Sequence, residues 1–126
     1  ISLDEIKEIT LENSVSEIFV AINKNFFNDE LPVLESALIS LSKLNIKGVL
    51  FYDLAVLSIK RRLNLSLDLV WNQTHMVTNY NTCNYYYDKG VKYGMLATEI
   101  TLDEMNEKYG NDFIFICYGV SFDVIF

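Results

Sequence analysis

The sequence has few of the residues that interrupt a chain, with one proline and five glycines among 126 residues. No linker rich in proline or serine and no low-complexity tract divides it, so we expect one domain over residues 1–126. Two cysteines are too few for a disulfide framework and favour a reducing, cytoplasmic setting. No apolar run approaches the roughly 20 residues of a membrane span, and residues 1–5 do not resemble a signal sequence, so we expect no membrane association.

Basic residues are also scarce. The sequence has 10 lysines and arginines and 17 aspartates and glutamates, which gives a net charge of −7. This balance gives no general attraction for phosphate backbones, so RNA binding by the chain alone is not expected. The best basic patch is Lys60, Arg61 and Arg62, near the end of a predicted helix. Such charges more often complement the helix dipole and stay solvated than bind nucleic acid.

What the chain does have is a repeated pattern, in which short apolar runs that end in a polar residue alternate with amphipathic stretches. The runs cover residues 17–23, 48–53, 67–73, 93–99 and 112–119. This pattern is typical of βα units and predicts an α/β fold with about five parallel strands. Five strands are too few for an eight-stranded TIM-type barrel, so the chain reads as a partial (β/α) barrel. We consider an open layer, a piece of a larger barrel, and a unit completed by a homo-oligomer or a partner subunit.

Helix signals separate these runs. Ser2 and Glu5 form a predicted capping box, and Pro32 suits the first turn of a helix whose leucines follow helical spacing. Further helices are predicted over residues 54–63 and 80–89, the second ending at Gly90. Tyr85, Tyr86 and Tyr87 point in three directions on that helix, so some pack on the sheet and the others are available for a partner surface.

Parallel sheets place their chemistry at the carboxyl ends of the strands. Asp53 and Glu99 end two strands and are the predicted catalytic pair, as general acid and base or as oxygen ligands of a metal. The alternative is structural: Asp53 caps the following helix and Glu99 bonds loop amides. The predicted substrate-binding residues are Asn23, Gln73, His75, Thr78, Asn79 and Tyr118, with Asn72 a further polar strand end.

Two residue types with their own chemistry give weaker signals. His75 is the single histidine, and no Ser/His/Asp spacing accompanies it, so a nucleophilic triad is not predicted. One histidine and two distant cysteines make a poor zinc set, and we predict no metal site of that kind. Cys83 lies inside a predicted helix with nothing nearby to depress its pKa, so we assign it to packing.

Several short segments, taken in order, resemble a known family. They are residues 2–9 (Ser-Leu-Asp-Glu-Ile-Lys-Glu-Ile), residues 19–23 (Phe-Val-Ala-Ile-Asn), residues 48–57 (Gly-Val-Leu-Phe-Tyr-Asp-Leu-Ala-Val-Leu), Thr78 with Asn79, residues 89–92 (Lys-Gly-Val-Lys) and residues 96–104 (Leu-Ala-Thr-Glu-Ile-Thr-Leu-Asp-Glu). Together they resemble the collagenase-like peptidase family thirty-two of the unclassified peptidases. The similarity spans about residues 2–119.

The resemblance implies that the chain is the middle part of a (β/α) barrel and a peptidase-like protein, a hydrolase acting on peptides with no assigned mechanism. The alternative is a non-catalytic accessory barrel subunit of a partner or of an RNA-modification complex. Family members that modify RNA or help make quinones hold an iron–sulfur cluster through cysteines, and this chain has no such set, so we assign no cofactor. The chain also departs from the family at Tyr118, where members commonly have histidine, and at Phe122, where they have cysteine.

Overall fold

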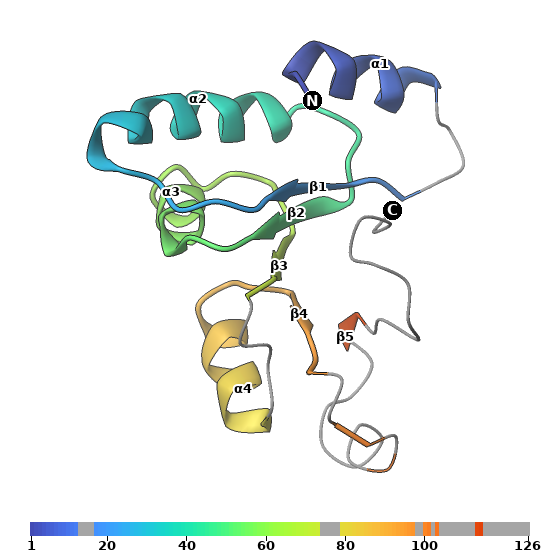
Figure 1. The fold of residues 1–126 in the computed structure, drawn as a ribbon, viewed down its shortest axis with the longest axis vertical. Coiled ribbons are helices and arrows are strands. Elements are labelled where there is room, and N and C mark those ends of the chain that lie inside the picture. Colours follow the sequence, from blue (N-terminus) through green and yellow to red (C-terminus); the bar gives the residue numbers. More distant parts are fainter. Residues whose placement is uncertain (13–16, 74–78, 98–99, 102, 104–112, 115–126) are drawn as a thin grey trace.

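The structure is a computed structural model that describes residues 1–12, 17–73, 79–97, 100–101, 103 and 113–114. Helices and strands alternate along the chain, as Figure 1 shows. The elements are α1 (Leu3–Glu12), β1 (Phe19–Ile22), the 3₁₀ helix η1 (Asn28–Glu30), α2 (Leu31–Leu41), β2 (Gly48–Phe51), α3 (Leu54–Arg62), β3 (Leu69–Trp71), α4 (Tyr80–Asp88), β4 (Tyr93–Met95) and β5 (Phe113–Ile114).

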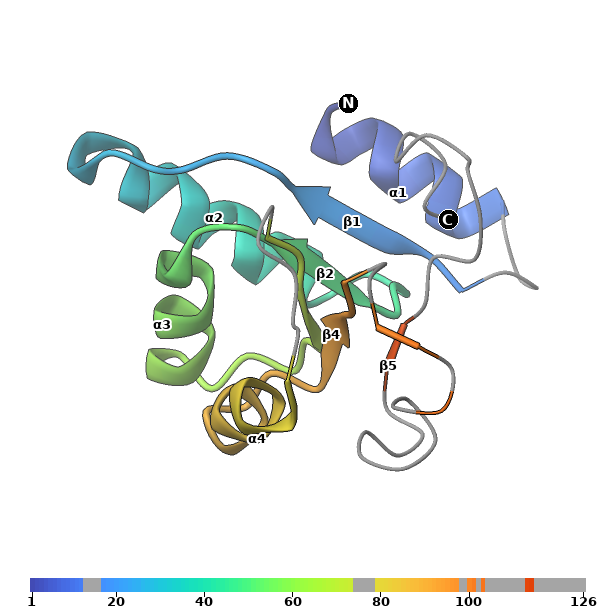
Figure 2. The same cartoon turned by 60° about the horizontal axis from the view of Figure 1, so that its bottom comes forward.

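The strands form one parallel sheet in the order β1-β2-β3-β4-β5, so each strand pairs with the next strand in the sequence. The register pairs Ala21 with Leu50, Leu50 with Val70, and Val70 with Tyr93. Right-handed crossovers between such neighbours place the helices on one face, and Figure 2 shows α2, α3 and α4 along the same side of the strands. The predicted α/β fold is confirmed, and this sequential order is the one found in part of a (β/α) barrel.

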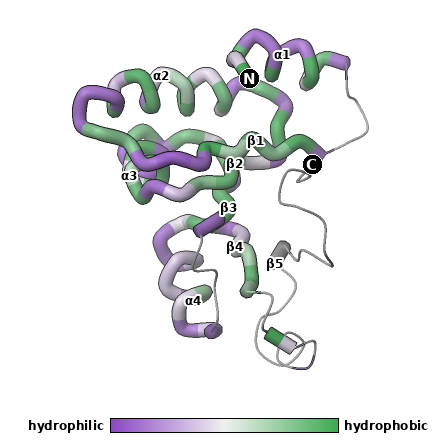
Figure 3. Tube along the Cα trace, viewed as in Figure 1, coloured by the Kyte–Doolittle hydropathy of each residue, from purple (hydrophilic) through white to green (hydrophobic). Residues whose placement is uncertain are grey.

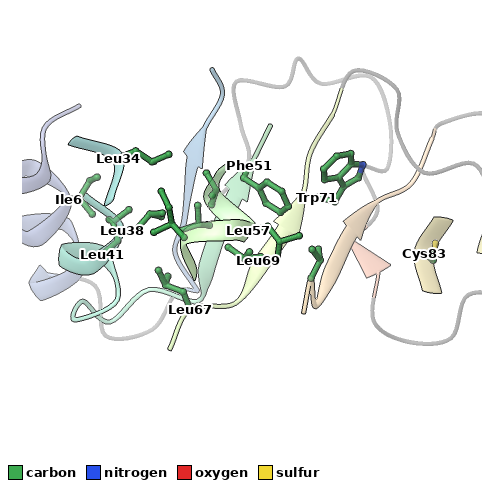
Figure 4. Packing of buried hydrophobic residues seen from close by; sticks show 14 of the residues in the cluster. Ile6, Leu34, Leu38, Leu41, Phe51, Leu57, Leu67, Leu69, Trp71 and Cys83 are labelled. Carbon is green, nitrogen blue, oxygen red and sulfur yellow. The ribbon is translucent and has the colours of Figure 1, made fainter. Parts of the chain in front are cut away.

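The core is layered because successive strand residues face opposite sides of the sheet. Phe51 and Trp71 lie on the face that packs against the helices, in one cluster with Leu34 and Leu38 of α2 and Leu57 of α3 (Figure 4). Their neighbours in the strands face the other way and form a smaller cluster. Its fully buried members are Leu50, Val70 and Met95. Burial on both faces explains why these strands read as nearly unbroken apolar runs.

The helix ends follow the sequence signals. The capping box at α1 is confirmed, since Ser2 Oγ accepts from the amide of Glu5 at 3.2 Å and a Glu5 carboxylate oxygen accepts from the amide of Ser2 at 2.6 Å. Pro32 lies in the first turn of α2, and Gly90 follows α4 with a φ of 97°. Figure 3 shows α2 as largely hydrophobic and α4 as pale or hydrophilic along the chain.

Two strand boundaries differ from the prediction. β3 begins at Leu69, although the apolar run begins at Leu67, and β4 covers Tyr93–Met95, although the run continues to residue 99. Strand pairing decides both, because the register of β3 with β2 begins at Leu69 and its register with β4 begins at Val70 and Tyr93. Leu67 is buried in the core but is not paired in the sheet. Most of the predicted fifth strand, in the run at residues 112–119, lies outside the described residues.

Candidate functional site

The carboxyl edge of the sheet carries the polar residues that the sequence places at strand ends. Asn23 follows β1, Asp53 follows β2, and Asn72 and Gln73 follow β3. Asn72 is 5% exposed and its amide donates to the carbonyl of Phe51 at 3.1 Å, which extends the β2–β3 ladder into this edge. Together with Asn79 at the start of α4, these four side chains are the described part of the predicted site.

Asp53 holds two backbone segments. One carboxylate oxygen accepts from the amide of Ala55 at 2.9 Å and caps α3, and the other accepts from the amide of Phe26 at 2.8 Å. Phe26 lies in the segment between β1 and α2, so this carboxylate ties that loop to the start of α3. The structural alternative for Asp53 is therefore confirmed, and its proposed catalytic role stays a prediction.

The amide side chains make their own contacts. Asn72 Nδ2 lies 3.4 Å from Asn23 Oδ1, which joins the ends of β1 and β3 across β2. Gln73 Nε2 donates to the carbonyl of Tyr52 at 2.5 Å. The structure thus brings Asn23 and Asn72 together and directs Gln73 to the neighbouring backbone. Amides offer both donors and acceptors and do not titrate, so this group suits orienting a polar ligand better than moving a proton.

Asn79 is placed differently from the other predicted binding residues. Its Oδ1 accepts from the amide of Thr82 at 3.0 Å and caps α4, and its side chain is exposed. Its recorded side-chain contacts stay within the first turn of α4. The remaining predicted site residues lie outside the described residues, and they are Glu99, His75, Thr78 and Tyr118.

The donor set in the described ranges does not fit an iron–sulfur cluster. Cys83 of α4 is the one cysteine in the described ranges. It is 8% exposed and packs in the core between α4 and the sheet. Within the same ranges, no three histidine, cysteine, aspartate or glutamate side chains are grouped as a metal site requires. None of the helices in the described part is long and apolar enough to cross a membrane.

Burial raises the pKa of the Cys83 thiol to about 11. Because the thiolate is the reactive form, iodoacetamide at pH 8 should alkylate folded Cys83 on the order of a hundredfold more slowly than an ordinary cysteine. Peptide mass spectrometry of samples quenched over time measures the rate, and the urea-unfolded protein supplies the reference. Equal rates in the folded and unfolded protein would contradict a packing role for Cys83.

A second concave surface lies on the helical side, between α3 and α4. It is a groove of about 630 Å³ lined by Leu54, Leu57, Ser58, Arg61, Arg62, Tyr85, Tyr86 and Lys89. Two features of the sequence contribute to this groove, the basic run at residues 60–62 and the tyrosine run at residues 85–87. Nothing in the sequence connects the two runs. The fold brings one side of each helix to the same groove because α3 and α4 follow neighbouring strands.

Comparison with known proteins adds to this geometry. The sequence model of Peptidase family U32 matches residues 1–109. The chain belongs to this family. Membership in U32 confirms the family predicted from the ordered motifs. The U32 chain is also similar to "tRNA hydroxylation protein P2" of Bacillus subtilis (strain 168), with 35% identity over 92 residues.

The similarity to the Bacillus subtilis protein is shared unequally by the two chains. It covers 73% of this chain and 30% of the Bacillus subtilis protein, so the chain spans less than a third of that relative. No solved structure matches the chain significantly. The family and the α/β sheet are therefore established independently of each other.

Proposed function

We propose that this U32 protein takes part in tRNA hydroxylation. The observation that carries the proposal is the 35% identity to a protein of that name over 73% of the chain. The carboxyl edge agrees with it, because the exposed amide of Asn23, which lies beside buried Asn72, can pair with the polar edge of a nucleobase. A cytoplasmic location, expected from the low cysteine content, suits a tRNA substrate.

Deleting the gene and analysing the nucleosides of bulk tRNA by mass spectrometry tests this function. We expect hydroxylated nucleosides to fall at least about tenfold and to return with the wild-type gene. Asn23→Ala should restore them only in part, since it removes the oxygen 3.4 Å from Asn72 Nδ2. Asn25→Ala is the matched control, because Asn25 is also exposed and has no side-chain hydrogen bond among the described residues.

An unchanged nucleoside profile in the deletion strain would overturn the proposal. Equal rescue by the Asn23 and Asn25 variants would show that Asn23 has no role in tRNA hydroxylation, while the proposed function of the protein would still stand. These two results are separate because the first concerns the whole protein and the second concerns one side chain.

Peptide hydrolysis is the second candidate function, favoured by the family to which the chain belongs. It would use Asp53 and Glu99 as acid and base or as oxygen ligands of a metal. The residues that would orient the peptide are Asn23, Gln73, Thr78 and Asn79. The described geometry favours it less, because both oxygens of Asp53 already accept backbone amides. Either function is compatible with further barrel strands supplied by a homo-oligomer or a partner subunit.

A further inference from the structure

We propose that the groove between α3 and α4 binds an unpaired segment of RNA. The inference rests on the proposed function in one respect, because tRNA is the expected RNA. The groove is on the helical side of the sheet, whereas Asn23 and Asn72 lie at the carboxyl edge of the strands. It would therefore hold part of the RNA away from the residues that face the modified base.

Cations from both helices line this groove. Arg61 comes from the last turn of α3, and Lys89 follows α4 directly. Within the described ranges neither forms an ion pair, whereas the neighbouring Arg62 is paired with Glu35 of α2. In a chain with a net charge of −7, two unpaired cations facing one groove form a local site for phosphate.

Aromatic rings supply the second feature that a binding site for unpaired RNA needs. Tyr86 stacks on buried Trp71, with ring centroids 4.1 Å apart and planes 25° apart. Tyr85 lies edge-on to Tyr86 at 5.4 Å and is 59% exposed, and Lys89 Nζ lies 5.4 Å from the Tyr85 ring centre. Trp71 thus holds the ring of Tyr86 in place, while the exposed ring of Tyr85 lines the groove. Exposed rings beside cations are the arrangement on which unpaired bases stack.

The size of the groove favours an unpaired strand. It is an open groove, and its volume of about 630 Å³ gives room for a splayed-out nucleotide lying along the surface. A duplex hides the faces of its bases and exposes its phosphates on a wide surface, so the tyrosines would have nothing to stack on. The combination of rings and cations therefore points to a loop or an end of tRNA.

The first test compares two tyrosines of α4. Tyr85 lines the groove at 59% exposure, while Tyr87 is 60% exposed and is not among the lining residues. Fluorescence anisotropy of the natural gene product with labelled oligouridine and with an unmodified tRNA transcript gives the Kd. We expect Tyr85→Ala to weaken binding at least about fivefold, and Tyr87→Ala to change it less than about twofold.

The second test uses the dependence of binding on salt. The double variant Arg61→Gln with Lys89→Gln should make the slope of log Kobs against log salt shallower by about 1.4, because two phosphate contacts are lost. The matched control is Lys43→Gln with Lys60→Gln, which removes two cations that form no ion pair among the described residues and do not line the groove. The control should leave the slope unchanged, although the net charge falls equally.

Each outcome decides the proposal. Failure of the wild-type protein to bind either RNA, or equal effects of the groove and control variants, would overturn it. If groove variants bind RNA normally and instead lose a co-purifying protein, the groove is a protein-docking surface and the proposal is also overturned. Groove-dependent RNA binding with an unchanged nucleoside profile in the deletion strain would support the groove and reject tRNA hydroxylation, so the two failures are distinguishable.

Discussion

Replacing Asp53 with alanine is expected to lower the free energy of unfolding by about 2–4 kcal/mol. The loss of an N-cap costs about 0.5–2 kcal/mol, and a partly buried amide without its acceptor costs about 1–3 kcal/mol more. Asp53 supplies both acceptors, to Ala55 at 2.9 Å and to Phe26 at 2.8 Å. Urea unfolding followed by circular dichroism measures the change.

Two further variants sharpen this prediction. Asp53→Asn keeps one acceptor oxygen and should lose about half as much stability, while Asp88→Ala should change little because Asp88 is exposed and has no side-chain partner among the described residues. Equal stability of Asp53→Ala and wild type would contradict the structural role. Peptide cleavage abolished by both Asp53→Asn and Glu99→Gln, under conditions where each variant is folded, would support the catalytic pair, and retained cleavage would exclude it.

Gly48→Ala is expected to destabilise the protein by about 2 kcal/mol or more. A Cβ at Gly48 would lie 2.7 Å from the carbonyl oxygen of Asp68, which is closer than real Cβ atoms approach. Asp68 has little freedom to retreat, because its carbonyl accepts from Val49 at 2.9 Å and its carboxylate pairs with Lys92 at 2.7 Å. The added methyl therefore forces β2 and β3 apart, and overpacking of this kind costs about 1–3 kcal/mol, occasionally more.

The comparison for this variant is Gly90→Ala. At Gly90 an added Cβ meets nothing within 4 Å, so only the positive φ of 97° opposes the substitution. That conformational cost is about 1–2 kcal/mol, and it leaves the sheet intact. Chemical denaturation of both variants separates the two causes. A Gly48→Ala protein as stable as the wild type would show that the two strands can move apart freely.

The fold was largely predictable from local pattern. The apolar runs at β1, β2 and β3 and the capping signal at Ser2 all produced the expected elements, whereas the cap at Asn79 was not predicted. Each of these signals acts within a few residues, which is why a single sequence contains them. Strand ends were less predictable, since the start of β4 depends on which residue of β3 lies opposite it.

The site was predictable in position and less so in its contacts. A cap at Asp53 was predictable as the alternative to catalysis, because its acceptor bond to Ala55 is local. The amide of Phe26 is 27 residues away, and its approach depends on the folded loop. The groove between α3 and α4 was also not predictable, because it depends on contacts between segments far apart in the sequence. Arg61 and Tyr85 each belonged to a run noticed in the sequence, and only the packing of α3 beside α4 gives the two runs a common surface.

The sequential order of the strands has a consequence for synthesis. Each of β2 to β5 pairs with the strand made just before it, so no strand must wait for a distant partner to be translated. A nascent chain can therefore enlarge its sheet one βα unit at a time, in the direction in which it leaves the ribosome. The edge that grows is always the most recently made one, and the segments already docked need no rearrangement when the next arrives.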